Sequence, residues 1–104
     1  MIDGDLKIAS RVEGSERVVV LGGEVSVSSV FSLVEALRSV TDAGESTIVD
    51  LSGVRYLDSQ GIRALRTAYQ QAIASGGAFR IRGCRGVVER AIRLVGLDRI
   101  VPVD

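Results

Sequence analysis

Two kinds of apolar spacing alternate along this chain, and the alternation limits the folds that it can adopt. In residues 5–12 (DLKIASRV) apolar side chains alternate with polar ones, and residues 17–23 (RVVVLGG) are rich in β-branched side chains. Both patterns are typical of strands, and the short EGS segment between them predicts a hairpin. From Ser28 or Ser29 the spacing changes to three and four residues, which indicates a helix that ends near DAG at 42–44.

The same two patterns repeat through the rest of the sequence. A strand is expected at 46–53 and an amphipathic helix at about 59–74, followed by a strand at 78–83 and a short helix at 86–96. The order β-β-α-β-α-β-α predicts one α/β domain over residues 1–104. Right-handed crossovers through the helices make part of its sheet parallel. We expect a mixed β-sheet of four to five strands with three to four helices packed on it.

The spacing also predicts which side chains are buried. On the first strand the inward positions are expected to be Leu6, Ile8 and Val12. On the second helix they are Ile62, Leu65, Tyr69, Ala72 and Ile73, and on the third helix they are Val87, Val88, Ala91, Ile92 and Val95. In AFRIRG, Phe79 and Ile81 should face the core. The arginines between and after them, Arg80 and Arg82, should face water and join Arg85 in a basic cluster on a solubilising edge.

The composition argues against several classes of function. Thirteen basic residues balance thirteen acidic ones, and a net charge of zero argues against general nucleic-acid binding. The chain contains no histidine and a single cysteine, Cys84, which are too few ligands for a structural zinc site. We therefore expect no direct nucleic-acid partner, no metal and no cofactor.

The sequence also indicates a cellular location. Asp3 and Asp5 stand where a signal peptide would be basic and then apolar, and no apolar segment approaches the ~20 residues of a membrane span. A lone cysteine cannot form an internal disulfide, which suits a reducing compartment. We expect a cytoplasmic protein that does not contact a membrane.

The segment LDSQG, residues 57–61, lies where a strand is expected to give way to a helix. Functional residues of such sheets collect beyond the carboxyl ends of the strands. The segment resembles the G-x-S-x-G nucleophile turn of α/β-hydrolases. Leu57 replaces the first glycine, however, and no histidine is present to accept the proton of Ser59. We therefore do not expect an enzyme.

Two other interpretations of this segment remain open. Asp58 or Ser59 is a favourable helix N-cap, which would give the pair a structural role alone. Alternatively, Asp58 is the cap, Ser59 presents its hydroxyl at the first helical position, and Gly61 allows another surface to approach the backbone. A phosphate on Ser59 would lie at the positive end of the helix dipole, beside the Asp58 carboxylate. Its charge would repel an acidic or apolar partner, and Arg63, four residues on, could pair with it.

Three segments, VVLGGEV, TIVDLSGVRYLDSQGIRAL and RAIRLVGLDRIVPV, give the chain a family resemblance. Over roughly residues 16–103 it resembles the STAS family of anti-sigma factor antagonists. The resemblance implies a small cytoplasmic bacterial regulator with helices packed on a mixed sheet. Unphosphorylated, such a protein binds a kinase-type anti-sigma factor, which then releases its sigma factor. The anti-sigma factor uses ATP to phosphorylate the serine that matches Ser59, and a phosphatase restores it.

The resemblance also implies which residues bind the partner. These are Glu24, Ser26, Asp58, Ser59, Gln60, Gly61 and Arg63. At Ser26 the sequence departs from the family, because GEVS stands where members commonly have GELD. The neutral hydroxyl suggests a divergent partner, or binding without efficient phosphorylation. STAS-like domains also serve as constitutive adaptor subunits of transporters and lipid-transport complexes, and that alternative requires no phosphorylation.

Overall fold

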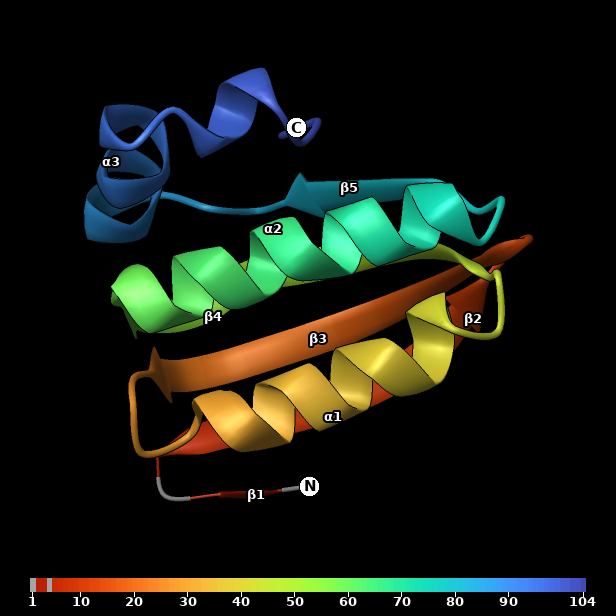
Figure 1. The fold of residues 1–104 in the computed structure, drawn as a ribbon. Helices are drawn as coiled ribbons and strands as arrows, with labels where there is room; N and C mark the ends of the chain where they lie inside the picture. The colour runs from red at the N-terminus through yellow and green to blue at the C-terminus, as the bar shows by residue number, and fades with distance from the viewer. Residues whose placement is uncertain (1, 4) are drawn as a thin grey trace.

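The computed structural model describes residues 2–3 and 5–104. Over these residues the strands form one sheet in the order β1-β2-β3-β4-β5 (Figure 1). Along the chain, the elements are β1 (Ile2–Asp3), β2 (Leu6–Glu13), β3 (Glu16–Val25), α1 (Val30–Thr41), β4 (Ser46–Leu57), α2 (Ser59–Ala74), β5 (Phe79–Arg82), α3 (Gly86–Leu94) and the short 3-10 helix η1 (Leu97–Arg99). The predicted order of strands and helices is confirmed, with the two-residue strand β1 added before it.

The sheet is mixed, as predicted. β1 pairs with β2 and β2 with β3 in antiparallel fashion, whereas β3 pairs with β4 and β4 with β5 in parallel. Glu13 pairs with Glu16, so the predicted hairpin closes through Gly14 and Ser15. Gly14 has a φ of 62°, a left-handed conformation that glycine adopts without strain. The parallel pairs place the carboxyl ends of β3 and β4 at the same edge of the sheet.

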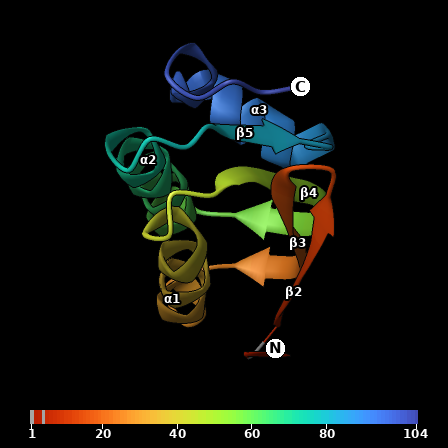
Figure 2. The same cartoon turned by 90° about the vertical axis from the view of Figure 1, so that its right-hand side faces the viewer.

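Helices α1 and α2 lie side by side on one face of the sheet, and both begin at that edge (Figures 1 and 2). Their buried residues, including Leu33, Leu37, Leu65 and Ala68, form one apolar core with the inner face of the strands. α3 and η1 extend this core beside β5. In the tail, Val103 forms a parallel bridge with Ile81 of β5. Within the described residues, no helix is long and apolar enough to cross a membrane.

The opposite face of the sheet carries ion pairs. Arg82 on β5 contacts Glu13 on β2 and Asp50 on β4, each at 3.1 Å, and Arg80 contacts Glu16 on β3 at 3.2 Å. Arg80 and Arg82 do face away from the core, as predicted, but they do not form an unpaired basic cluster with Arg85. Their carboxylate partners lie far away in the sequence, so local sequence patterns did not reveal them.

Three further predictions need correction. β4 does not end near Gly53 but continues to Leu57, with irregular pairing where Gly22 lies beside Gly53. Val12 and Ile73 were expected to be buried but are exposed, because each lies near one end of an element that the core covers only in part. On α3 the expected inward residues Val87 and Val95 are exposed as well, since only the side with Val88 and Ile92 faces the core.

Candidate functional site

The candidate site is the corner where β3 and β4 end and α1 and α2 begin. In the parallel pairing of these strands, Val25 lies beside Leu57, and the amide of Asp58 donates a hydrogen bond to the Val25 carbonyl at 3.1 Å. The loop from Ser26 to Ser29 therefore lies next to the junction between β4 and α2. We call this region the Ser59 corner; it contains Glu24, Ser26, Asp58, Ser59, Gln60, Gly61 and Arg63.

Asp58 is the N-cap of α2, which is compatible with both interpretations of the LDSQG segment. Its backbone is extended, and its Oδ1 accepts hydrogen bonds from the amides of Gln60 at 3.0 Å and Gly61 at 3.1 Å. These bonds satisfy two amides that a helix start would otherwise leave without partners. Ser59 is thus the first helical residue. It is exposed, and its hydroxyl makes no hydrogen bond to any described part of the chain.

Gly61 is present for a reason that differs from the predicted one. The residue is buried, and a Cβ there would lie against the side chains of Leu57 and of Val25, whose Cγ1 would be only 2.7 Å away. The missing side chain therefore lets the first turn of α2 pack closely on the ends of β3 and β4. This packing fixes the position of the neighbouring Ser59, and the glycine does not open the backbone to an outside surface.

The loop before α1 is held by its serines. Ser29 is buried; its Oγ accepts a hydrogen bond from the Ser26 amide at 3.1 Å and donates to the Glu24 carbonyl at 3.2 Å. Ser29 occupies the N-cap position of α1, but its hydroxyl bonds within the loop and not to the helix amides. The Oγ atoms of Ser26 and Ser28 lie 3.0 Å apart. Ser26 thus contributes a neutral hydroxyl that bonds within its own loop.

Charged and apolar side chains surround the loop from Ser26 to Ser29 and the junction between β4 and α2. Glu24 is half-exposed and forms a 3.6 Å ion pair with Arg55 of β4. At such exposure a pair of this kind contributes little stability, so both groups can exchange partners easily. Val27, Phe31 and Tyr56 are exposed nearby on the loop, α1 and β4. We did not identify these three residues from the sequence as part of the site. Phe31 could have been found, because it lies outside the apolar stripe that α1 buries.

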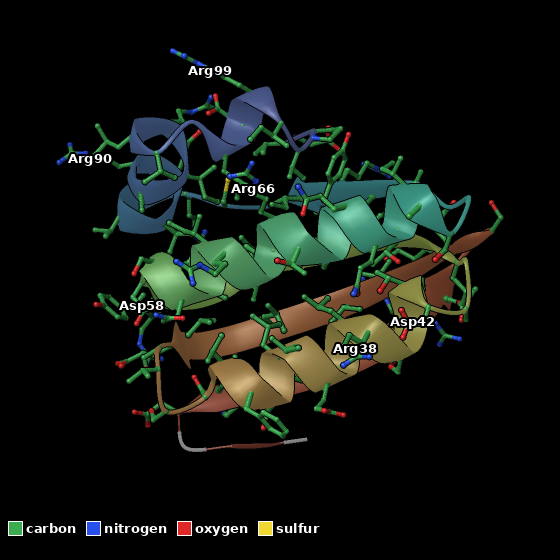
Figure 3. All side chains as sticks on the ribbon, in the orientation of Figure 1. Arg38, Asp42, Asp58, Arg66, Arg90 and Arg99 are labelled. Carbon is green, nitrogen blue, oxygen red and sulfur yellow. The ribbon has the colours of Figure 1, made fainter. Side chains whose placement is uncertain are left out.

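Two hollows adjoin the corner. One, of about 200 Å³, is lined by Ser59 and by Ile62, Arg63, Arg66, Val95, Leu97 and Ile100. The other, of about 210 Å³, lies between α1 and α2. Half of its lining residues are apolar, and the other half are Arg38, Gln60, Arg63, Thr67 and Gln71. Arg63 therefore lies between the two hollows. Neither Arg63 nor Arg66 forms an ion pair with any described residue. Figure 3 shows Asp58 at this end of α2 and Arg66 further along the helix.

Groups that could activate the Ser59 hydroxyl are not found beside it in the described residues. The chain has no histidine, and no base lies within hydrogen-bonding reach of the Ser59 hydroxyl in the described residues. Among those residues, no cluster of acidic, cysteine or histidine side chains could hold a metal ion. Burial raises the pKa of Cys84, which makes its thiol a poor nucleophile near neutral pH. What remains is an exposed hydroxyl on a rigid helix start.

The chain matches a known family. Residues 8–102 match the family described as "Mlab, STAS domain", so the chain belongs to the STAS family. Its sequence is similar to the anti-sigma-F factor antagonist RsfB of Mycobacterium tuberculosis. The identity is 32% over 83 residues, which cover 79% of this chain and 67% of RsfB.

Solved structures agree with this assignment. An anti-sigma factor antagonist from Mycobacterium paratuberculosis is 27% identical and superposes with a TM-score of 0.86, covering 94% of this chain and 84% of that one. SpoIIAA, an anti-sigma factor antagonist in its unphosphorylated form, is 16% identical with a TM-score of 0.78, covering 94% and 88% of the two chains. The likeness to SpoIIAA shows the fold alone. The relatives named here are regulators of anti-sigma factors.

Proposed function

We propose that this protein is an anti-sigma factor antagonist with no enzymatic activity of its own. Unphosphorylated, it binds a kinase-type anti-sigma factor at the Ser59 corner, and the anti-sigma factor then releases its sigma factor. Phosphorylation of Ser59 by the same partner ends the binding, and a phosphatase restores it. The observation that carries this proposal is the Ser59 hydroxyl, which is exposed and unbonded at a helix start that Asp58 and Gly61 hold in place.

The hydrogen bonds of Asp58 support an electrostatic switch. Asp58 already occupies the amides of Gln60 and Gly61. A phosphate on Ser59 could not take those donors without displacing the cap, so its charge of about −1.5 to −2 would project towards the partner beside an existing carboxylate. Converting a complex from almost fully bound to almost fully free takes about 5.5 kcal/mol of differential affinity. One phosphate can supply that amount if it lies in the desolvated centre of an interface.

The first test compares substitutions of Ser59. Ser59→Ala should bind the purified anti-sigma factor as tightly as the original chain, because it removes only a hydroxyl. Ser59→Glu should weaken the affinity by about tenfold or more, because it brings a permanent negative charge into the interface. Ser75→Glu places the same charge at the other end of α2 and is the matched control. Titration calorimetry measures all three, and equal affinities of the two Ser59 variants would refute the switch.

A second test follows the phosphate itself. Incubation with the anti-sigma factor and ATP should add one phosphate to the original chain and none to the Ser59→Ala variant, as measured by intact-mass analysis. Ser26 replaces the aspartate common in the family, so we expect Ser26→Asp to raise the rate of incorporation if the partner is of the usual type. An unchanged or lower rate would indicate a divergent partner. Phosphate at any serine other than Ser59 would contradict the proposal.

The family description favours a second candidate function, because it includes the name Mlab. In that case the chain would be a constitutive adaptor subunit of a transporter or lipid-transport complex. Such an adaptor would incorporate no phosphate with any cellular kinase, and it would copurify with a transport ATPase. Measuring phosphate incorporation and identifying the protein that copurifies therefore separate the two candidate functions.

A further inference from the structure

Four aliphatic side chains of α3 and the residues after it lie in solvent. Leu94 is 79% exposed, the largest fraction among the large hydrophobic residues that the structure describes, and Val87 is 69% exposed. Val95 and Ile100 are exposed too. We call these four residues the α3 patch. In soluble domains, exposed apolar residues that gather in one place mark an interaction surface more often than scattered ones do.

Folding does not require the α3 patch. Val88 and Ile92, on the other side of α3, are fully buried, and Leu97 and Val101 continue the same core through η1 and the tail. The core beside β5 is therefore closed without Val87 and Leu94. These two residues are seven positions apart, two helical turns, and so lie along one outer side of α3.

Arginines without acidic partners surround the patch. Arg90 and Arg99 are exposed and form no ion pair or hydrogen bond within the described part of the chain, and the same is true of Arg66 on α2. Figure 3 shows Arg90 and Arg99 projecting from the molecule on the α3 side. Arg93, by contrast, is held between Glu89 and Asp98 at 3.1 Å from each. The surface thus offers aliphatic groups and three arginines, Arg66, Arg90 and Arg99, that have no ion-pair partner among the described residues.

The patch is continuous with the Ser59 corner. Val95 and Ile100 belong to the same hollow as Ser59, and Arg66 lines it from α2. A protein that covers Ser59 can therefore reach Val95, the residue that follows α3, within one hollow. A second hollow, lined by Arg90 and Leu94 among others, lies on α3, and Leu94 is the chain neighbour of Val95 in the first hollow.

We propose that the anti-sigma factor extends over the α3 patch and contacts it with a surface of aliphatic side chains flanked by carboxylates. This inference rests on the proposed function, and it adds a second contact region whose partner chemistry the three free arginines specify. The Ser59 corner supplies the switch, and the α3 patch supplies affinity that the phosphate does not directly oppose. Such affinity would also compensate for the missing aspartate at Ser26.

Two other occupants fit the surface less well. A second copy of this chain, docked patch to patch, would bring Arg90 and Arg99 against the same arginines. An anionic lipid surface would attract the arginines as well, but it would meet the α3 patch as a nearly flat face. The hollows beside Leu94 and Ile100 suit protruding protein side chains better than a flat bilayer.

Crosslinking tests the inference in the native cell. A photo-crosslinking amino acid is introduced in place of Gln60, at the corner, or in place of Leu94, in the patch, with Val12 on the hairpin as the control position. We expect Gln60 and Leu94 to capture the same protein and Val12 to capture none. Capture at Gln60 but not at Leu94, or of a different protein or lipid at Leu94, would overturn the inference and leave the proposed function intact. Capture at neither position would overturn both.

Affinity measurements with the captured partner show how much the α3 patch contributes to binding. Leu94→Glu and Arg90→Glu should each weaken binding of the Ser59→Ala protein by about tenfold or more, whereas Val12→Glu should leave it within about twofold. Arg90→Lys keeps the charge and should retain most of the affinity. Circular dichroism checks that each variant folds. Unchanged affinity in both folded Glu variants would refute the contact, even if Ser59→Glu still abolishes binding.

Discussion

At the scale of single residues, two positions define the Ser59 corner. The Asp58 cap could be predicted from the sequence, because a carboxylate just before an amphipathic run is a local signal. The reason for Gly61 could not be predicted, since it depends on Val25, which reaches the site only when β3 pairs with β4. The position of the exposed Ser59 hydroxyl therefore depends on the Asp58 cap, which the local sequence predicts, and on the packing of Gly61 against Val25, which forms only in the folded chain.

Gly61→Ala tests this packing. The added Cβ would collide with Leu57 and Val25, and overpacking of this kind costs about 1–3 kcal/mol. The better helix propensity of alanine offsets about 1 kcal/mol of this cost. We expect a net loss of about 1–2 kcal/mol in the free energy of unfolding, measured by urea denaturation. Gln60→Ala, at the exposed neighbouring position, should change it by less than about 0.5 kcal/mol. A gain in stability from Gly61→Ala would show that the backbone there is not closely packed.

At the scale of elements, the sequence predicted where helices and strands lie better than which of their sides is buried. Both Val88–Ile92 and Val87–Leu94 are apolar pairs at helical spacing on α3, and periodicity alone does not decide which pair meets the core. The contact with the strands buries the first pair. The same limit explains Val12 and Ile73, which fit the pattern of their elements but lie where the core no longer covers them.

Substitutions on the two sides of α3 should therefore have unequal effects on stability. Ile92→Ala removes a buried side chain and should lower the free energy of unfolding by about 2–5 kcal/mol. Leu94→Ala, two positions away on the same helix, should change it by less than about 0.5 kcal/mol. Thermal or urea denaturation measures both. Comparable losses would mean that Leu94 contributes to the folded core.

At the scale of the whole molecule, the two faces of the sheet are stabilised differently. Helices cover one face, while the other carries the ion pairs of Arg80 and Arg82. Hydrogen bonds from Arg82 and Arg11 lower the pKa of Glu13 from its ordinary value near 4.5 to about 2. For Asp50, burial raises the pKa, but hydrogen bonds from Ser52 and Arg82 outweigh it and lower the pKa overall.

These shifts predict how stability depends on acid. A carboxylate whose pKa is lower in the folded state stabilises the protein above its unfolded pKa, and the contribution is lost as the pH falls through the folded pKa. For Glu13 that window extends from about pH 4.5 down to about pH 2. Glu13→Gln should flatten the decline of the urea midpoint across this window, with Glu35→Gln as the control for removing an exposed carboxylate. An identical slope in the original chain and in the Glu13→Gln variant would show that the Arg82 contact is absent in solution.

The order of the sheet has a consequence for how the protein is made. Each strand pairs with the one that precedes it in the sequence, from β1 to β5. No strand must insert between two that have already paired, so a nascent chain can extend the sheet at one edge as it leaves the ribosome. Contacts between consecutive elements also keep loop closures short and favour rapid folding. Because α2 precedes β5 and α3 in the sequence, the elements that build the Ser59 corner leave the ribosome before β5 and α3 do.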